Sequence, residues 1–61
     1  MSTEELILLE VKEKLDFSIR SLRVIRGAMA PGEGNETLFD ALADCTWAYR
    51  RVNHVLASLA K

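Results

Sequence analysis

The chain has 61 residues, 49% of them hydrophobic and 28% charged, and its eight Lys and Arg against nine Asp and Glu give a net charge of −1. A chain this short forms at most one domain, and it buries so little surface that it usually needs a disulfide, a structural metal or a second subunit. One cysteine excludes an internal disulfide, and one cysteine with one histidine excludes a four-ligand zinc site. Oligomerisation is therefore the expected source of stability.

The first predicted element is a helix over residues 3 to 30. Ser2 and Glu5 have the spacing of a capping box at its start. Hydrophobic positions then recur in alternating steps of three and four, the heptad pattern of a helix packed along its length. This seam consists of Leu8, Val11, Leu15, Ser18, Leu22, Ile25 and Met29. Phe17 and Val24 lie about 120° from its centre, so we expect the helix to have neighbours on two sides.

The second predicted element is a turn over residues 31 to 35, which holds the only proline and two of the three glycines. Proline disfavours helical geometry at the residue before it, so the first helix should end here. A second helix is predicted over residues 36 to 60, with Asn35 or Thr37 as its cap. Its heptad seam consists of Leu38, Leu42, Cys45, Tyr49, Val52, Leu56 and Leu59.

These elements predict an all-α fold, an antiparallel two-helix hairpin that occupies residues 1–61 as a single domain. Two helices cannot enclose a core, and the economical solution is a homodimer of hairpins that forms a four-helix bundle. A higher oligomer or a different partner would also cover the apolar faces. The predicted oligomer core contains Leu8, Val11, Leu15, Phe17, Leu22, Val24, Ile25, Leu38, Leu42, Cys45, Tyr49, Val52, Leu56 and Leu59.

The order of charges supports an antiparallel hairpin. Successive blocks over residues 1–16, 17–30, 31–45 and 46–61 carry net charges of −3, +3, −4 and +3. A chain that folds back at Pro31 places blocks of opposite sign side by side. Each exposed pair contributes only a few tenths of a kcal/mol, so charge is expected to set register rather than stability.

Residues that could support catalysis are few, and we expect no enzyme activity, no cofactor and no metal. Cys45 and His54 are nine residues apart on one helix, which places them on opposite faces. Paired acids such as Asp40 and Asp44 lie off the seam, and no histidine follows a glutamate at the spacing of a di-metal site. No glycine-rich phosphate loop is present.

A cluster of Arg20, Arg23 and Arg26 gives two interpretations. These side chains can face Asp40 and Asp44 across the hairpin, or they can contact nucleic-acid phosphates. A small two-helix subunit of this kind resembles, in architecture, the plasmid-copy-number RNA-binding protein Rop. No motif matches that family residue by residue, so the likeness implies no RNA-contact positions. The net charge of −1 argues against nucleic acid as the main partner.

Trp47 breaks the polar pattern of the second helix, because it points about 180° away from the seam. Arg51 at i+4 is placed to stack on the ring, and Arg50 and His54 flank it. Tryptophan and arginine are enriched at interface hot spots. The four residues therefore form a candidate interaction surface, which is an oligomer contact, a site for a different protein, or a Trp lying flat under an arginine.

These observations favour a cytoplasmic protein that acts through protein–protein interaction, as an adaptor, regulator or inhibitor, with a nucleic-acid-binding regulator as the alternative. Residues 1–5 are acidic, unlike the basic start of a signal peptide. Charges interrupt every apolar run, so no membrane association is expected. The unpaired Cys45 fits a reducing compartment.

Overall fold

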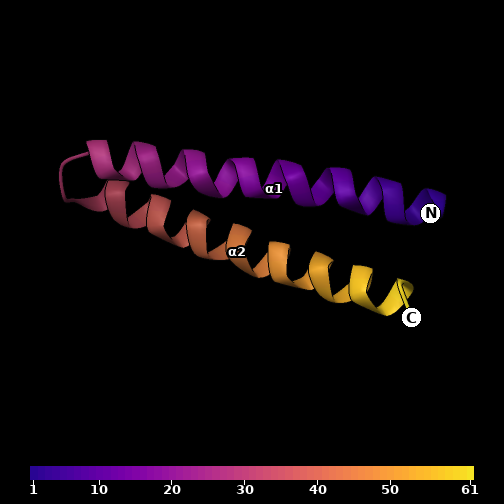
Figure 1. Ribbon diagram of the computed structural model, residues 1–61. Helices are drawn as coiled ribbons and strands as arrows, with labels where there is room; N and C mark the ends of the chain where they lie inside the picture. Colours follow the sequence, from indigo (N-terminus) through magenta and orange to yellow (C-terminus); the bar gives the residue numbers. More distant parts are fainter.

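The computed structural model describes residues 1–61 as two helices and no strands. Helix α1 spans Thr3–Ala28 and helix α2 spans Glu33–Leu59. They run antiparallel and lie side by side, with the turn at one end and both chain termini at the other (Figure 1). The predicted all-α helical hairpin is confirmed. The molecule is long and thin, with principal extents of 44, 14 and 11 Å.

The start of α1 confirms the capping box. The Ser2 hydroxyl accepts a hydrogen bond from the Glu5 backbone N–H at 3.2 Å, and the Glu5 carboxylate accepts one from the Ser2 backbone N–H at 3.3 Å. Two N–H groups that the first turn leaves without helical partners are satisfied in this way. Glu4 and Glu5 also place negative charge where the helix dipole favours it.

The turn is shorter than predicted, because α2 begins at Glu33. Gly32 precedes it with φ of 154°, a backbone conformation that side-chain-bearing residues rarely adopt. The expected caps were wrong: Thr37 lies inside the helix and donates to the Glu33 carbonyl oxygen at 2.9 Å. Glycine gives the chain its reversal in four residues, and no side-chain cap is used.

Asn35 joins the two helices beside the turn instead of capping α2. Its side-chain amide donates to the Arg26 carbonyl oxygen at 3.0 Å, and its Oδ1 accepts from Arg26 Nε at 2.9 Å. Arg26 Nε also lies 3.3 Å from the Asn35 carbonyl oxygen. The Arg26 guanidinium stacks on the Phe39 ring, 4.6 Å from its centroid. These contacts tie the last turn of α1 to the first turns of α2.

The contact between the helices uses one row of residues on each. The α2 row matches the predicted seam up to Leu56 and adds Asn35, and its members are half-buried: Asn35, Leu38, Leu42, Cys45, Tyr49, Val52 and Leu56. The α1 row is rotated from the predicted seam and consists of Leu8, Lys12, Leu15, Ile19, Leu22 and Arg26. Ile19, at its centre, is the only buried residue, at 7% exposure.

The α1 seam was therefore half wrong as a description of the hairpin contact. Leu8, Leu15 and Leu22 do face α2, whereas Val11, Ile25 and Met29 are exposed and Ser18 lies at the edge. The physical reason is that the predicted seam is centred between two surfaces of α1. One surface faces α2, and the other lies on a side of the hairpin that nothing covers.

Charge does not link the helices as expected. The two ion pairs lie within α1, Lys14 with Glu10 at 3.1 Å and Arg20 with Asp16 at 3.2 Å. Asp40 and Asp44 pair with no arginine, because their positions on α2 point away from α1. Neither helix has an apolar stretch that could cross a bilayer.

Candidate interaction surface

One side of the hairpin carries uncovered apolar residues from both helices. On each helix, the residues that precede the contact row by one position point about 100° away from it. Helix α2 runs in the opposite direction to α1, and its contact row points in the opposite direction as well. These two reversals cancel, so the two rows lie on the same side of the hairpin. We call this the apolar side and define it by Ile7, Val11, Ser18 and Ile25 of α1 and Ala41, Ala48 and Val55 of α2.

The exposure of these residues shows how incomplete the hairpin is. Ile7 is 56% exposed, Ile25 51% and Val55 44%. Ser18 is polar, but its hydroxyl already donates to the Lys14 carbonyl oxygen at 2.9 Å, so it requires no water. Lys14, Asp44 and Arg51 share the two rows and supply charge along the margins.

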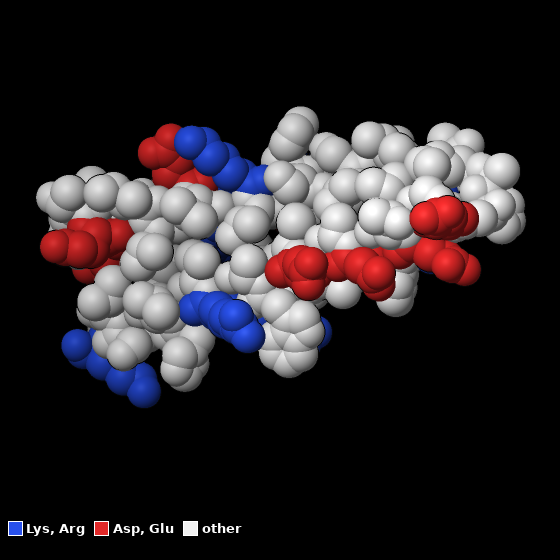
Figure 2. Space-filling model, turned by 180° about the vertical axis from the view of Figure 1, so that it is seen from behind, with Lys and Arg blue, Asp and Glu red and all other residues white.

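The other side of the hairpin carries charged and polar residues, with Leu9, the exposed Phe39 and Ala43 among them. The residues that follow the contact rows by one position include Glu13, Asp16, Arg20 and Arg23 on α1 and Thr46, Arg50 and Asn53 on α2. Charge is not confined to this side, because the view from behind shows an acidic row along the half of the molecule nearer the turn, beside a broad uncharged area (Figure 2). Ile7, Val11, Ile25 and Val55 thus gather on one side of the hairpin, whereas charged groups occur on both sides.

Trp47 lies on the outer face of α2, as the helical wheel predicted, and is 58% exposed. Arg50, rather than Arg51, stacks on the ring, with its guanidinium carbon 5.6 Å from the centroid. Arg51 instead joins Trp47, Asp44 and Ala48 around a shallow depression, the Trp47 depression. His54 is exposed one turn or more further along the helix. The predicted surface residues therefore share one outer face, with Ala48 connecting them to the apolar side.

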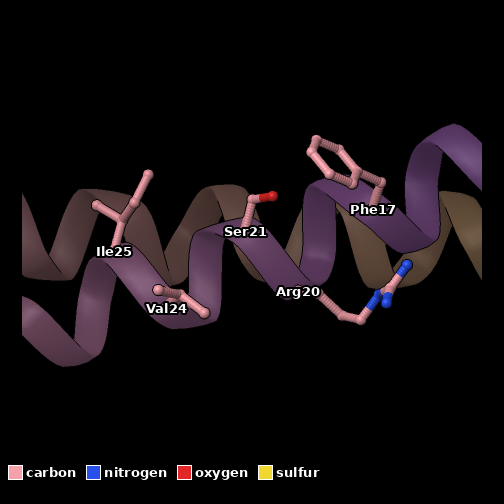
Figure 3. Close-up of a pocket in the computed structure, with 5 residues that line it drawn as sticks. All are labelled: Phe17, Arg20, Ser21, Val24 and Ile25. Carbon is pink, nitrogen blue, oxygen red and sulfur yellow. The ribbon is translucent and has the colours of Figure 1, made fainter.

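A second depression, the α1 groove, was not predicted as a site. It is lined by Phe17, Arg20, Ser21, Val24 and Ile25. In Figure 3, Ser21 lies between Phe17 and Ile25 along one edge of α1, while α2 passes behind. Phe17 is 66% and Val24 74% exposed. The sequence signal was present, since both residues lay outside the seam, but it was assigned to the oligomer core in general.

The arginines of the cluster have different partners, although Arg23 and Arg26 line one depression. Arg26 is bonded to Asn35 and stacked on Phe39, and Arg20 is paired with Asp16. Arg23 is exposed and lies near Gly27, Asn35 and Leu42. No salt bridge joins these arginines to Asp40 or Asp44, although Arg26 and Asp40 line one depression, and Asn35 supplies the oxygen bonded to Arg26.

Nucleophilic and metal-binding groups are scattered. Cys45 is a free thiol in the α2 contact row, half-buried against α1, whereas His54 is exposed on the outer face. No group of three or more His, Cys, Asp and Glu side chains is placed to hold a metal ion. Comparison with protein-family models, with curated proteins and with solved structures gave no match to this chain.

Proposed function

We propose that this chain is a non-enzymatic interaction protein whose hairpins pair into a four-helix bundle, and that the bundle binds another protein as an adaptor, regulator or inhibitor. The observation that carries the proposal is the imbalance of burial. One of 61 residues is buried, while large apolar side chains remain exposed along both helices. Soluble chains rarely leave so much contiguous apolar surface uncovered unless it is used for association.

The apolar side supports a second copy of the hairpin as its first occupant. A two-fold dimer brings the same surface of both subunits together, so the surface must be complementary to itself. Here bulky Ile and Val on α1 lie beside small Ala41 and Ala48 on α2, which is the mixture of large and small residues that interdigitates well. Packing of the two apolar sides produces the four-helix arrangement.

The surface for a different protein is proposed around Trp47, Arg50, Arg51 and His54. Trp47 already lies against one arginine, so its ring is held in place before a partner binds. An aromatic ring fixed in advance contributes binding energy at a lower entropic cost. Its neighbours are Arg50 and Arg51 together with Asp44, so a partner segment that carries an aromatic ring and charges of both signs fits this face.

Light scattering and sedimentation of the full chain test the dimer. We expect a dimer of about 14 kDa at micromolar concentration, twice the 6.8 kDa of one chain. A folded monomer over this range would contradict the dimer. Chemical denaturation at several protein concentrations provides a second readout, because the midpoint of a dimer rises with concentration and that of a monomer does not.

Affinity capture from native lysate tests the partner surface. Wild-type protein and the Trp47→Ala variant serve as paired baits, and Ser58→Ala, an exposed position of the same helix, is the matched control. A partner retained by wild type and Ser58→Ala and lost with Trp47→Ala supports the surface. Identical capture by all three baits would contradict it.

Cys45 bears on where the protein works. Its thiol is free, and it lies in the helix contact rather than at a surface where pairing with another cysteine is easy. We propose a reducing compartment, the cytoplasm, as the place of action. Cell fractionation with an epitope-tagged chain tests this, and recovery in an oxidising compartment would contradict it.

Nucleic-acid binding stays a prediction, and no contact in the structure favours it over protein binding. Titration of structured RNA and duplex DNA at low salt separates the two functions. Binding that weakens steeply as salt rises would identify phosphate contacts. We expect flat titrations, because two of the three clustered arginines already have partners within the hairpin.

A further inference from the structure

The two depressions occupy equivalent places on the two helices. Phe17 precedes Ile19 of the contact row by two positions, and Trp47 precedes Tyr49 by two. Each ring therefore lies just beyond the apolar side, on the outer edge of its helix. Each depression also includes one residue of the apolar side, Ile25 in the α1 groove and Ala48 in the Trp47 depression. A dimer that packs through the apolar side must therefore bring an outer edge of one copy next to an outer edge of the other.

Contacts within the hairpin fix which residues lie at the same height along it. Lys12 lies over the Tyr49 ring, 5.8 Å from its centroid, and Arg26 is bonded to Asn35. In both pairs the residue numbers add to 61, so residue i of α1 lies level with residue 61 − i of α2. If the dimer axis runs parallel to the helices, each residue keeps its height in the second copy. Helix α1 then lies beside the partner's α2 in this same register.

In that register the charges at the margin match. Glu10 is level with the partner's Arg51, and both lie on the same outer edge. Lys14 lies three residues, or about 5 Å, from the height of the partner's Asp44. Phe17 and the partner's Trp47 are separated by the same about 5 Å along the axis, so their rings lie on neighbouring ridges. Opposite charges and apolar rings therefore meet across one edge.

The opposite orientation matches charges less completely, since it brings Arg51 level with the partner's Asp40 but also brings like charges together. With the turns at opposite ends, α1 lies beside the partner's α1, and α2 beside the partner's α2. Full overlap of the helices then brings Asp44 close to Asp44 of the partner subunit, on the same side of the contact. Like charges placed directly opposite each other are destabilising. The block charges alone do not distinguish the orientations, since both join acidic to basic halves.

We propose that two copies pair with their turns at the same end, so that the Phe17 end of the α1 groove of one copy adjoins the Trp47 depression of the other and forms one composite surface with it. This inference rests on the dimer proposed above and adds its orientation. Each dimer carries two such surfaces, walled by Phe17 of one subunit and by Trp47 of the partner subunit, with Glu10 and the partner's Arg51 beside them. The protein-binding face proposed around Trp47 is thus completed only by a second copy.

A charge-exchange cycle tests the proposed edge. Glu10→Arg and Arg51→Glu are each expected to weaken dimerisation about two- to fivefold per edge, and the double variant to restore it. Glu10 and Arg51 of one copy lie on opposite outer edges of the hairpin, so coupling between them must arise between copies. Glu10→Arg also removes the ion pair with Lys14, but this effect is subtracted in the cycle and does not enter the coupling energy. Glu10→Arg combined with Arg50→Glu, on the polar side, is the matched control and should show no rescue.

A distance measurement gives an independent answer. Nitroxide labels on Glu33→Cys, in a Cys45→Ser background with wild-type helicity, report the separation of the two turns. Turns at the same end place the labels roughly 20 Å apart, about two helix diameters, whereas opposite ends place them about 40 Å apart, about one helix length. A dimer with the long distance and no charge rescue would overturn this orientation and leave the proposed dimer standing. A monomeric wild type would overturn both.

Discussion

Ile25 is the residue on which the dimer can be tested most quantitatively, through the substitution Ile25→Ala. The side chain is 51% exposed in the single hairpin, so about half of it remains for a second copy to cover. Full burial of isoleucine contributes about 2 kcal/mol, so each Ile25 should contribute about 1 kcal/mol to association and the two together about 2 kcal/mol. The variant should therefore dimerise about 30-fold more weakly.

Sedimentation equilibrium of wild type, Ile25→Ala and Phe39→Ala measures this effect. Phe39 is the matched control, because it is 52% exposed but lies under Arg26, away from the apolar side. Phe39→Ala should change the dimer dissociation constant by less than about threefold. Equal weakening of dimerisation by both variants would refute the reasoning. It would mean that the exposed apolar area of a residue matters, and that the side of the hairpin on which it lies does not. Far-ultraviolet circular dichroism at the same concentrations checks that helicity is retained.

Three further substitutions probe the turn and the outer face. Asn35→Ala removes the hydrogen bonds to Arg26 and should lower the free energy of unfolding, measured by urea denaturation, by about 1–2 kcal/mol. Asn53 is the control, because its side chain is half-buried and makes no hydrogen bond, so Asn53→Ala should lower the free energy of unfolding by less than about 0.5 kcal/mol. Gly32→Ala places a side chain on a residue with φ of 154° and should destabilise the protein by about 1–3 kcal/mol. Gly27 lies inside α1 with open space around it, so Gly27→Ala should stabilise the protein by up to about 1 kcal/mol. The reverse order of their thermal midpoints would contradict the assigned backbone roles. Trp47→Ala should keep wild-type helicity, because the ring faces away from α1, and a loss of ellipticity at 222 nm would contradict that placement.

The helices and their starting signals were predictable because they depend on neighbours in sequence. The capping box of Ser2 and Glu5 needs only residues three apart, and the heptad seam of α2 needs only helical periodicity. Cap positions near the turn were predicted less well. Asn35 has the chemistry of a cap, but its amide and oxygen find Arg26 across the turn, a partner that is visible only once the chain has folded back.

For the candidate surface as well, local features were predictable and contacts that depend on folding were not. Trp47 was found from its place on the helical wheel, because an aromatic side chain on a polar face is a local departure from pattern. The α1 groove was missed as a site, since its residues extend an apolar face and nothing in the sequence says where that face stops being covered. The stacking partner of Trp47 was also assigned wrongly. Arg50 and Arg51 are both within helical reach, and only the folded rotamers place Arg50 over the ring.

The sequence by itself determined two helices, the cap at the amino end of the first, a reversal near Pro31 and an apolar width too great for one neighbour. It did so because helical periodicity and glycine or proline chemistry act over a few residues. The tertiary structure alone decided which half of the α1 seam faces α2 and which half faces outward. That division depends on the rotation of one helix against the other, which the packing of the contact rows decides and the Arg26–Asn35 and Lys12–Tyr49 contacts accompany. The near-zero net charge carried no such information, because ion pairs formed within α1 and left the orientation of the helices to packing.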